Sequence, residues 1–375
     1  MENSTLSFYF DLTMFMDIGH LRYPAFVFCL LLYSFIVSAN LAMILIILQE
    51  STLHEPMYIF IAFLSANSLY GSTGFFPRFL MDLLSDTHLI SRPACFTQIY
   101  VIYTYASFEL TFLSIMAYDR YVAVCHPLHY HRKMTPKTVY TLVFFAWICP
   151  ACYLTVSITL SARLPLCGNK IQKVYCANWN IIKSSCITNA VNNIVAMLGA
   201  IFIAFIPFGF ILYTYLRIVV ACWKKSSEVR GKVLQSCLPH VISFVVYSIT
   251  SFSDTALSRQ NLDEINPFVA VILSLEFVII PPVLNPVVYG LKLPEIRRHV
   301  VKILCLKHKT QTGPLSHSIP SSTYPSPFSL LHHPSTLTPL PFIPHPIPSF
   351  ITPSSLDPIP SSHTPSSLDP QSFIP

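Results

Sequence analysis

The sequence predicts an all-α membrane protein: a bundle of seven transmembrane helices, followed by a short amphipathic helix and a disordered C-terminal tail. The chain has 375 residues, of which 53% are hydrophobic and only 11% charged, whereas soluble domains are about 25% charged. Seven apolar runs are long enough to cross a lipid bilayer, which takes about 20 residues each. The net charge of +6 gives no case for a nucleic-acid partner, because the basic residues stand next to apolar runs.

Each apolar run is expected to be a helix, because backbone groups in lipid must hydrogen-bond within their own segment. The second run carries the weakest signal, since Gly71, Gly74, Pro77 and Arg78 interrupt it. The runs cover residues 23–49, 57–84, 95–125, 138–161, 190–222, 233–257 and 266–290.

Lys and Arg gather in the segments after the third, fifth and seventh runs, and this predicts that these segments face the cytoplasm. We expect a multi-pass protein of the plasma membrane with residues 1–22 extracellular, a seven-helix domain over 23–308 and a cytoplasmic tail over 309–375. The sequon at Asn3 then lies outside, where it could be glycosylated. The basic residues are Arg132, Lys133 and Lys137, then Lys224, Lys225, Arg230 and Lys232, then Arg297, Arg298 and Lys302.

Residues 310–375 contain 16 of the 31 prolines and no Lys or Arg. Such a segment cannot bury a core and is expected to be disordered. It could bind a partner, but we favour a dispensable extension or an artefact of the gene model.

Four cysteines fall in the predicted outer segments, where oxidation is permitted. They allow three disulfide pairings. These residues are Cys95, Cys167, Cys176 and Cys186.

The stretch "MAYDRYVAVCHPLHY" (116–130) resembles the signature of odorant receptors, a branch of the rhodopsin-like G-protein-coupled receptors. Four further segments resemble segments of the same family and occur in the same order as in that family. Their residues are most similar to those of fish odorant receptors. The resemblance covers about residues 1–305. The segments are "PMYIFIAFLSANSLYG" (56–71), "LCGNKIQKVYCANWNIIKSSC" (166–186), "KVLQSCLPH" (232–240) and "PPVLNPVVYGLKLPEIRR" (281–298).

The resemblance implies an activation switch at the cytoplasmic end of the third helix. Asp119 would hold Arg120 at rest, and an agonist would free Arg120 to meet a heterotrimeric G protein of the stimulatory, olfactory type. An interfacial salt bridge that only anchors the helix is the alternative. The other residues implied are Tyr121, Tyr215, Asn285, Pro286 and Tyr289, with Asn40 as the expected partner of Asn285.

The resemblance also implies two disulfides, Cys95 with Cys176 and Cys167 with Cys186. Cys305, after the seventh run, is a candidate for palmitoylation.

Two acidic residues stand inside predicted spans, where an ionisable side chain usually indicates a functional site. Glu109 lies 11 residues before Arg120, about 16 Å deeper along a helix. Glu276 lies nine residues before Asn285 and is expected to be similarly buried. Ser68 stands where related receptors carry an Asp of a sodium site, so Glu109 could supply the missing carboxylate. A protonated Glu109 bonded to its neighbours is about equally favoured.

The expected ligand is a small organic odorant, held in the outer third of the bundle mainly by burial. By resemblance, Ile102 stands where amine receptors carry an Asp, which excludes an aminergic ion pair there. The sixth run departs from the family at Tyr247 and Ser248, and Asp254 could contact the ligand or face water. The candidate ligand-binding residues are Ile102, Tyr103, Ala106, Ser107, Gly199, Ile203, Ser248, Ser251 and Asp254.

A transporter or channel is the alternative function, but the chain shows no repeated halves. A membrane enzyme is not expected, because neither His-Glu-x-x-His nor Gly-x-Ser-x-Gly occurs. His126, His129 and His131 are more easily explained as solvated loop residues than as metal ligands. We therefore expect no cofactor and no metal.

Overall fold

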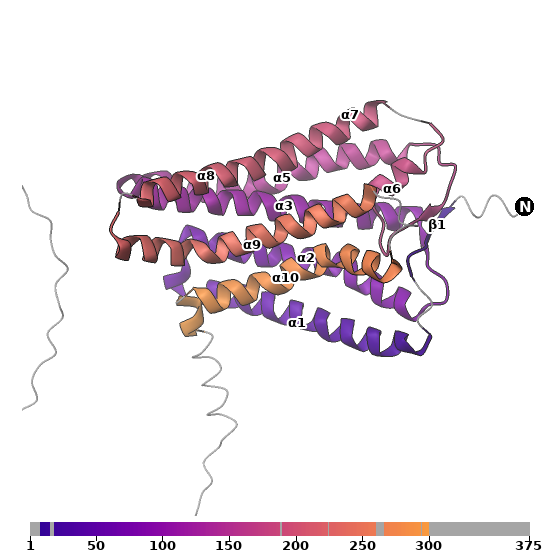
Figure 1. Cartoon of the computed structure of the whole chain (residues 1–375), viewed down its shortest axis with the longest axis horizontal. Helices are drawn as coiled ribbons and strands as arrows, with labels where there is room; N and C mark the ends of the chain where they lie inside the picture. Colours follow the sequence, from indigo (N-terminus) through magenta and orange to yellow (C-terminus); the bar gives the residue numbers. More distant parts are fainter. Residues whose placement is uncertain are drawn as a thin grey trace, which may run out of the picture. The chain divides into compact units, whose positions relative to one another are not determined.

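The seven predicted spans are helices in the computed structural model of the protein, which describes residues 8–15, 19–187, 190–223, 225–259, 266–293 and 295–299 (Figure 1). All seven are long and apolar enough to cross a membrane. They are α1 (Arg22–Gln49), α2 (Pro56–Leu84), α3 (Arg92–Cys125), α5 (Pro136–Ala162), α7–η5–α8 (Ala190–Gly199, Ala200–Phe205, Ile206–Trp223), α9 (Ser227–Arg259) and α10 (Pro267–Lys292).

Several spans begin where the sequence supplies a helix start. Proline stands in the first turn of α2, α3, α5 and α10, where its missing N–H costs no hydrogen bond. Thr135 accepts a hydrogen bond of 3.2 Å from the backbone N–H of Thr138 and so caps α5. Asn266 caps α10 in the same way, through Phe268.

Helix α3 lies at the centre of the bundle and packs against α2, α5, α8 and α9, whereas α1 packs against α2 and α10. Gly71 explains part of the close packing between α2 and α3, because a Cβ at this position would lie 2.5 Å from ring carbons of Tyr105. The glycines that weaken the apolar signal of the second run thus include one that lets two helices approach closely.

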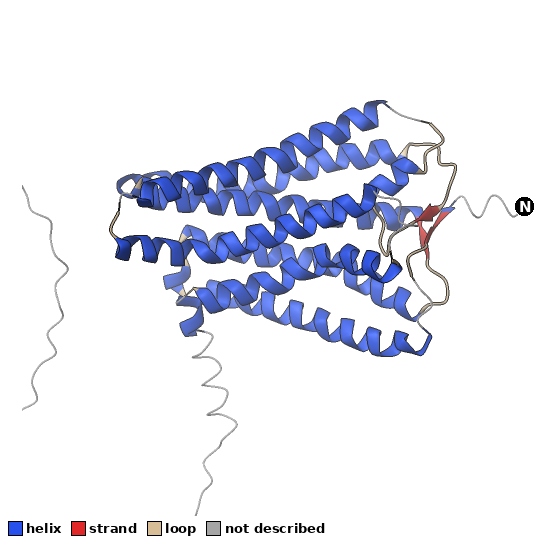
Figure 2. Ribbon diagram, in the orientation of Figure 1, coloured by secondary structure: helices blue, strands red, loops and turns tan. Residues whose placement is uncertain are grey.

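One end of the bundle carries a small three-stranded sheet, which the all-α prediction did not include (Figure 2). The central strand β1 (Tyr9–Leu12) pairs antiparallel with β2 (Leu89–Ser91) and parallel with β3 (Lys170–Ile171). These strands are two to four residues long, too short to show a clear alternating pattern. We call this end of the bundle the sheet end.

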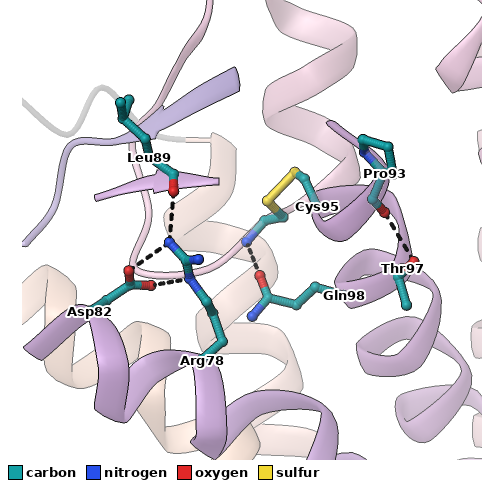
Figure 3. Close-up of a disulfide and its surroundings, with 8 residues drawn as sticks. Arg78, Asp82, Leu89, Pro93, Cys95, Thr97 and Gln98 are labelled. Carbon is teal, nitrogen blue, oxygen red and sulfur yellow. Dashed lines mark hydrogen bonds and ion pairs between the residues drawn. A yellow bond between two sulfur atoms is a disulfide. The ribbon is translucent and has the colours of Figure 1, made fainter. Parts of the chain in front are cut away.

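Two disulfides stabilise the sheet end, and both have the pairing that the resemblance implies. Cys95 at the start of α3 is bonded to Cys176, and Cys167 is bonded to Cys186. The side chain of Gln98 accepts a 3.0 Å hydrogen bond from the backbone N–H of Cys176, next to the first disulfide (Figure 3). The segment between α5 and α7 is therefore covalently linked to the first turn of α3.

Arg78, which interrupts the second apolar run, is neutralised within its own helix. Its guanidinium makes two hydrogen bonds to Asp82, of 2.7 and 2.8 Å, and a third of 2.8 Å to the carbonyl of Leu89 (Figure 3). Because Asp82 is almost completely buried, the pair lets two charges stay near the end of a span.

The opposite end, which we call the basic end, carries Arg132, Lys133 and Lys137 and the short helix α4 (Tyr130–Lys133). Residues 295–299 are helical, and they form part of the short helix expected after the seventh span. Asn3, Lys224, Cys305 and the Pro-rich tail lie outside the described residues. The remaining elements are η2 (Gly19–Leu21), η3 (Ser51–Leu53), η4 (Pro127–His129) and α6 (Asn178–Lys183).

Candidate functional site

A cavity of about 350 Å³ opens between the spans toward the sheet end. Helices α3, α5, α9 and α10 and the region around η5 line it, and the segment between α5 and α7 contributes α6. All the residues predicted to contact a ligand line this cavity, except Ser248. The lining residues among them are Ile102, Tyr103, Ala106, Ser107, Gly199, Ile203, Ser251 and Asp254.

Ser248 was predicted wrongly as a lining residue. Its hydroxyl donates a 2.7 Å hydrogen bond to the carbonyl of Phe244 within α9. Tyr247 lines the cavity instead, and its hydroxyl donates a 2.9 Å hydrogen bond to the carbonyl of Ala106 in α3. One residue along a helix is a rotation of about 100°, so a small error in helix orientation moves a side chain out of the site.

Several aromatic residues that were not predicted from the sequence also line the cavity. Tyr175 and Trp179 come from the segment between α5 and α7, and their place over the bundle follows from the disulfide at Cys176. Tyr153 of α5 reaches across to donate a hydrogen bond to the carbonyl of Val195 in α7. Phe277 contributes from α10. The position of Cys176 was the one signal that could have pointed to Tyr175 and Trp179.

Gly199 is required where α7 passes Tyr153. A Cβ at position 199 would overlap the hydroxyl of Tyr153. Helix α7 then continues into the π-helical turn η5, which contains Ile203. Such turns often occur at functional sites, and Gly199 and Ile203 both line the cavity.

Asp254 at the sheet end of α9 takes part in an ion pair, which the sequence analysis did not foresee. Lys173 Nζ donates to Oδ1 of Asp254, and the Tyr175 hydroxyl donates a 2.7 Å hydrogen bond to the same oxygen. The Lys173 side chain is fully buried, whereas that of Asp254 is 19% exposed. Burial lowers the pKa of Lys173, and the charge of Asp254 opposes this effect. Burial also raises the pKa of the Tyr175 hydroxyl.

Glu109 is buried between the spans and joins three helices. It accepts hydrogen bonds from Asn67 Nδ2 of α2, at 3.0 Å, and from Asn285 Nδ2 of α10, at 2.7 Å. Asn67 also donates to the carbonyl of Tyr105, at 3.1 Å. The predicted burial of Glu109 is therefore observed, but that of Glu276 is wrong. Glu276 is only half buried, and no described residue hydrogen-bonds to its side chain.

The expected pairing of Asn40 with Asn285 is also wrong. Asn40 Nδ2 donates a 2.9 Å hydrogen bond to the carbonyl of Pro282. This carbonyl would normally accept from residue 286, which is a proline and has no N–H. Asn40 thus satisfies the backbone group that Pro286 frees, while Asn285 turns toward Glu109.

Asp119 and Arg120 form an ion pair of 2.6 Å at the basic end of α3. Tyr130 donates a 2.8 Å hydrogen bond to the other oxygen of Asp119. Burial, together with the Asp119 charge, raises the pKa of the Tyr130 hydroxyl. Arg120 also donates a 3.1 Å hydrogen bond to Ser236 of α9. The arginine therefore links α3 to α9, in addition to its contact with Asp119.

Tyr215 and Tyr121, two other predicted switch residues, each pair with a histidine. Tyr215 of α8 makes a 2.5 Å hydrogen bond with His240 Nδ1 of α9, and His240 Nε2 lies 2.8 Å from the carbonyl of Leu113 in α3. His240 lies in a segment that carries the family resemblance, but no role was predicted for it. Tyr121 pairs with His126 at 3.2 Å, and Tyr289 is fully buried. Among the described residues, no group of three or more His, Cys, Asp or Glu side chains could hold a metal ion.

The comparisons with known proteins agree with this arrangement. A family model described as "Olfactory receptor" matches residues 28–307. Human olfactory receptor 11A1 is 31% identical over 309 residues, which are 81% of this chain and 95% of that protein. Rat olfactory receptor 1468 is 32% identical over 78% of this chain and 91% of its own length. The crystal structure of squid rhodopsin matches with a TM-score of 0.65 and 14% identity, over 82% of this chain and 95% of that one, and supports the fold. The chain belongs to the olfactory receptor family.

Proposed function

We propose that this odorant receptor binds a small organic molecule in the cavity near the sheet end and activates a heterotrimeric G protein at the basic end. The observation that carries the proposal is the cavity itself, which aromatic and aliphatic side chains line together with a few hydroxyls. Such a site binds small ligands mainly by burial and orients them with one or two hydrogen bonds. Ile102, Tyr103 and Ser107 would contact the ligand from α3.

The orientation in the membrane is part of this proposal. The sheet end would face the exterior of the plasma membrane, because it holds both disulfides and disulfides persist in oxidising compartments. The basic end would face the cytoplasm, in agreement with the positive-inside rule. Asn3 would then be available for glycosylation outside and Cys305 for palmitoylation inside.

Helix α9 gives a physical route from the ligand to the G protein. Polar contacts hold this helix along its length, and a ligand beside Asp254 or Tyr247 would change the contacts nearest to the cavity. If α9 moved away from α3, Arg120 would lose Ser236 and become free for a G protein, which we expect to be the stimulatory, olfactory type. The contacts, from the sheet end to the basic end, are Asp254 with Lys173, Tyr247 with the Ala106 carbonyl, His240 with the Leu113 carbonyl, and Ser236 with Arg120.

Glu109, which joins α3 to α2 and α10, is a candidate ligand for a sodium ion. Oδ1 of Asn67 is buried and accepts no hydrogen bond from any residue that the structure describes, so it is a second oxygen that a cation could use. The competing hypothesis is a neutral Glu109 that only bonds to its neighbours. Thermal unfolding of the purified receptor in sodium chloride and in choline chloride separates the two, because only an ion site makes the unfolding temperature depend on sodium.

A ligand screen with a second-messenger readout tests the main proposal. Cells that express the receptor with a stimulatory G protein are exposed to a panel of small odorants, and cyclic AMP is recorded. We expect some odorants to raise cyclic AMP in the wild type and to have no effect in Arg120→Ala at equal surface expression. A direct ion current or solute flux without a G protein would instead support a channel or transporter. Membership of the olfactory receptor family does not favour this alternative.

A further inference from the structure

The cavity contains one acidic side chain whose charge is already matched. Asp254 lines the cavity, whereas the Lys173 that pairs with it does not. Lys173 and Tyr175 both donate to Oδ1 of Asp254. Oδ2 of Asp254 accepts no hydrogen bond from the described parts of the chain, and the side chain is 19% exposed. One carboxylate oxygen therefore remains available to a molecule in the cavity.

Lys173 is held in this position by the covalent structure around it. It lies three residues before Cys176, which the disulfide joins to Cys95 at the start of α3. Its side chain is fully buried, with Nζ 3.2 Å from the Tyr175 hydroxyl and 5.0 Å from the centre of the Tyr175 ring. Displacing the ammonium would leave a buried charge without its partner, which is strongly unfavourable.

This arrangement discriminates between ligands by their charge. An ammonium ligand beside Asp254 would share its carboxylate with Lys173 and be repelled by the lysine. A carboxylate ligand would be repelled by Asp254 and could not reach the covered lysine. Arg259 is a cation that does line the cavity, but it is exposed and lies over the Trp179 ring at 5.1 Å. Water would screen any ion pair that a ligand made with this arginine.

We propose that Lys173 masks the charge of Asp254 and thereby selects neutral ligands that carry a hydroxyl or N–H group, with Oδ2 of Asp254 as their hydrogen-bond acceptor. This inference rests on the proposed binding of odorants in the cavity. A hydrogen bond to a carboxylate is about twice as strong as one between neutral groups. A ligand without a hydrogen-bond donor would be held only by the burial of its apolar surface.

Matched probes and four receptors test the proposal. Straight-chain, cyclohexyl and phenyl skeletons of six to ten carbons are each supplied as the alcohol, the methyl ether, the amine and the carboxylate. Cyclic AMP responses and surface expression are measured for the wild type, Lys173→Met, Asp254→Asn and the double variant. Lys170→Met, which alters an exposed lysine of the same segment, is the matched control.

The expected pattern differs for each receptor. The wild type and Lys170→Met should respond to alcohols at concentrations at least about tenfold lower than to the ethers, which corresponds to about 1.4 kcal/mol, and should not respond to amines. The Lys173→Met receptor should gain responses to amines, because the Asp254 carboxylate has then lost the ammonium that it pairs with. Asp254→Asn should lose most of the preference for alcohols over ethers. The double variant should lose both that preference and the gain toward amines.

Two results would overturn the inference. One is a wild type that prefers amines or carboxylates, and the other is a Lys173→Met receptor that reaches the surface without gaining any response to amines. If Lys173→Met fails to reach the surface, the exchange Lys173→Asp with Asp254→Lys restores the ion pair and should abolish the preference for alcohols over ethers, because a lysine in the cavity donates a hydrogen bond to either oxygen. An unchanged preference in the exchanged receptor would also overturn the inference. Silence of every receptor toward every probe would contradict the proposed function itself.

Discussion

Glu109 in α3 accepts a 2.7 Å hydrogen bond from Nδ2 of Asn285 in α10, and both side chains are almost completely buried. Asn67 from α2 donates to the other oxygen of the same carboxylate, at 3.0 Å. Three helices that are distant in the sequence are thus joined by one acidic side chain. This is a strong constraint on the core of the receptor, because buried polar groups are costly when they lose their partners.

Replacing Glu109 by Ala should destabilise the receptor, because the amide groups of Asn67 and Asn285 would each lose an acceptor. Each buried donor left unpaired costs about 1–3 kcal/mol. The thermal unfolding temperature of the purified protein in detergent measures the effect. Glu276→Gln is the matched control, since Glu276 is half buried and outside this network. Equal unfolding temperatures for the two variants would show that the network contributes little.

Replacing Arg120 by Ala should abolish G-protein signalling while leaving surface expression nearly unchanged. The arginine contacts Asp119 and Ser236 at the basic end and is not part of the hydrophobic core. Agonist-dependent cyclic AMP and surface labelling of the same cells measure the two effects. Arg132→Ala, an exposed residue at the same end, serves as the control. Normal agonist-driven signalling from Arg120→Ala would refute its role in the switch.

Loss of Cys95 or Cys176 should cause retention inside the cell. This disulfide fixes the segment that holds β3, Lys173 and Tyr175 over the bundle. Disulfides of small secreted domains are typically worth about 2–5 kcal/mol. Surface labelling measures the effect in Cys95→Ser and Cys176→Ser. Cys149→Ser is the control, because Cys149 forms no disulfide. Peptide mapping without reduction that found Cys95 linked to Cys167 would contradict the pairing.

Replacing Tyr103 by Ala should weaken the response to a small odorant far more than it weakens surface expression. Tyr103 lines the cavity from α3, and we expect the half-maximal concentration of an identified agonist to rise by at least about tenfold, or 1.4 kcal/mol. Ser248→Ala is the control, because its hydroxyl bonds within α9 and does not line the cavity. Dose–response curves that move in neither Tyr103→Ala nor Ser107→Val would place the ligand elsewhere.

Truncation after Lys309 should preserve trafficking and signalling. The segment removed is rich in proline and lacks Lys and Arg, so it is not expected to form a packed domain or to offer positive charge to anionic lipids. The truncated receptor keeps Cys305. Surface labelling and agonist-driven cyclic AMP would be compared with the full chain. A truncated receptor that reaches the surface but fails to signal would show that the tail takes part in coupling.

The spans could be predicted because the bilayer requires long apolar segments, whatever their tertiary contacts. The pair of Asp119 and Arg120 could also be predicted, since the two are neighbours in the chain. Pairs between helices could not be predicted in this way. Asn40 binds the Pro282 carbonyl rather than Asn285, because the rotation of each helix about its axis decides which side chains face each other.

The contacts at the sheet end were beyond sequence reasoning for another reason. Lys173 and Asp254 are 81 residues apart, and neither stands in a pattern that points to the other. Their contact depends on the path of the segment between α5 and α7, which the disulfide at Cys176 and the strand β3 determine together. The same path brings Trp179 over the cavity.

Strand β1 has a consequence for the order of biosynthesis. Residues 9–12 pair with residues 170–171, so the ribosome must add roughly 160 more residues before the sheet can close, which takes about 8–30 s at 5–20 residues per second. Throughout that interval the edge of β1 that pairs with β3 has to stay unpaired yet accessible, although β2 can already pair with the other edge. An epitope tag placed directly before Tyr9 would therefore need a flexible spacer, because a bulky group there would compete with the late closure of the sheet.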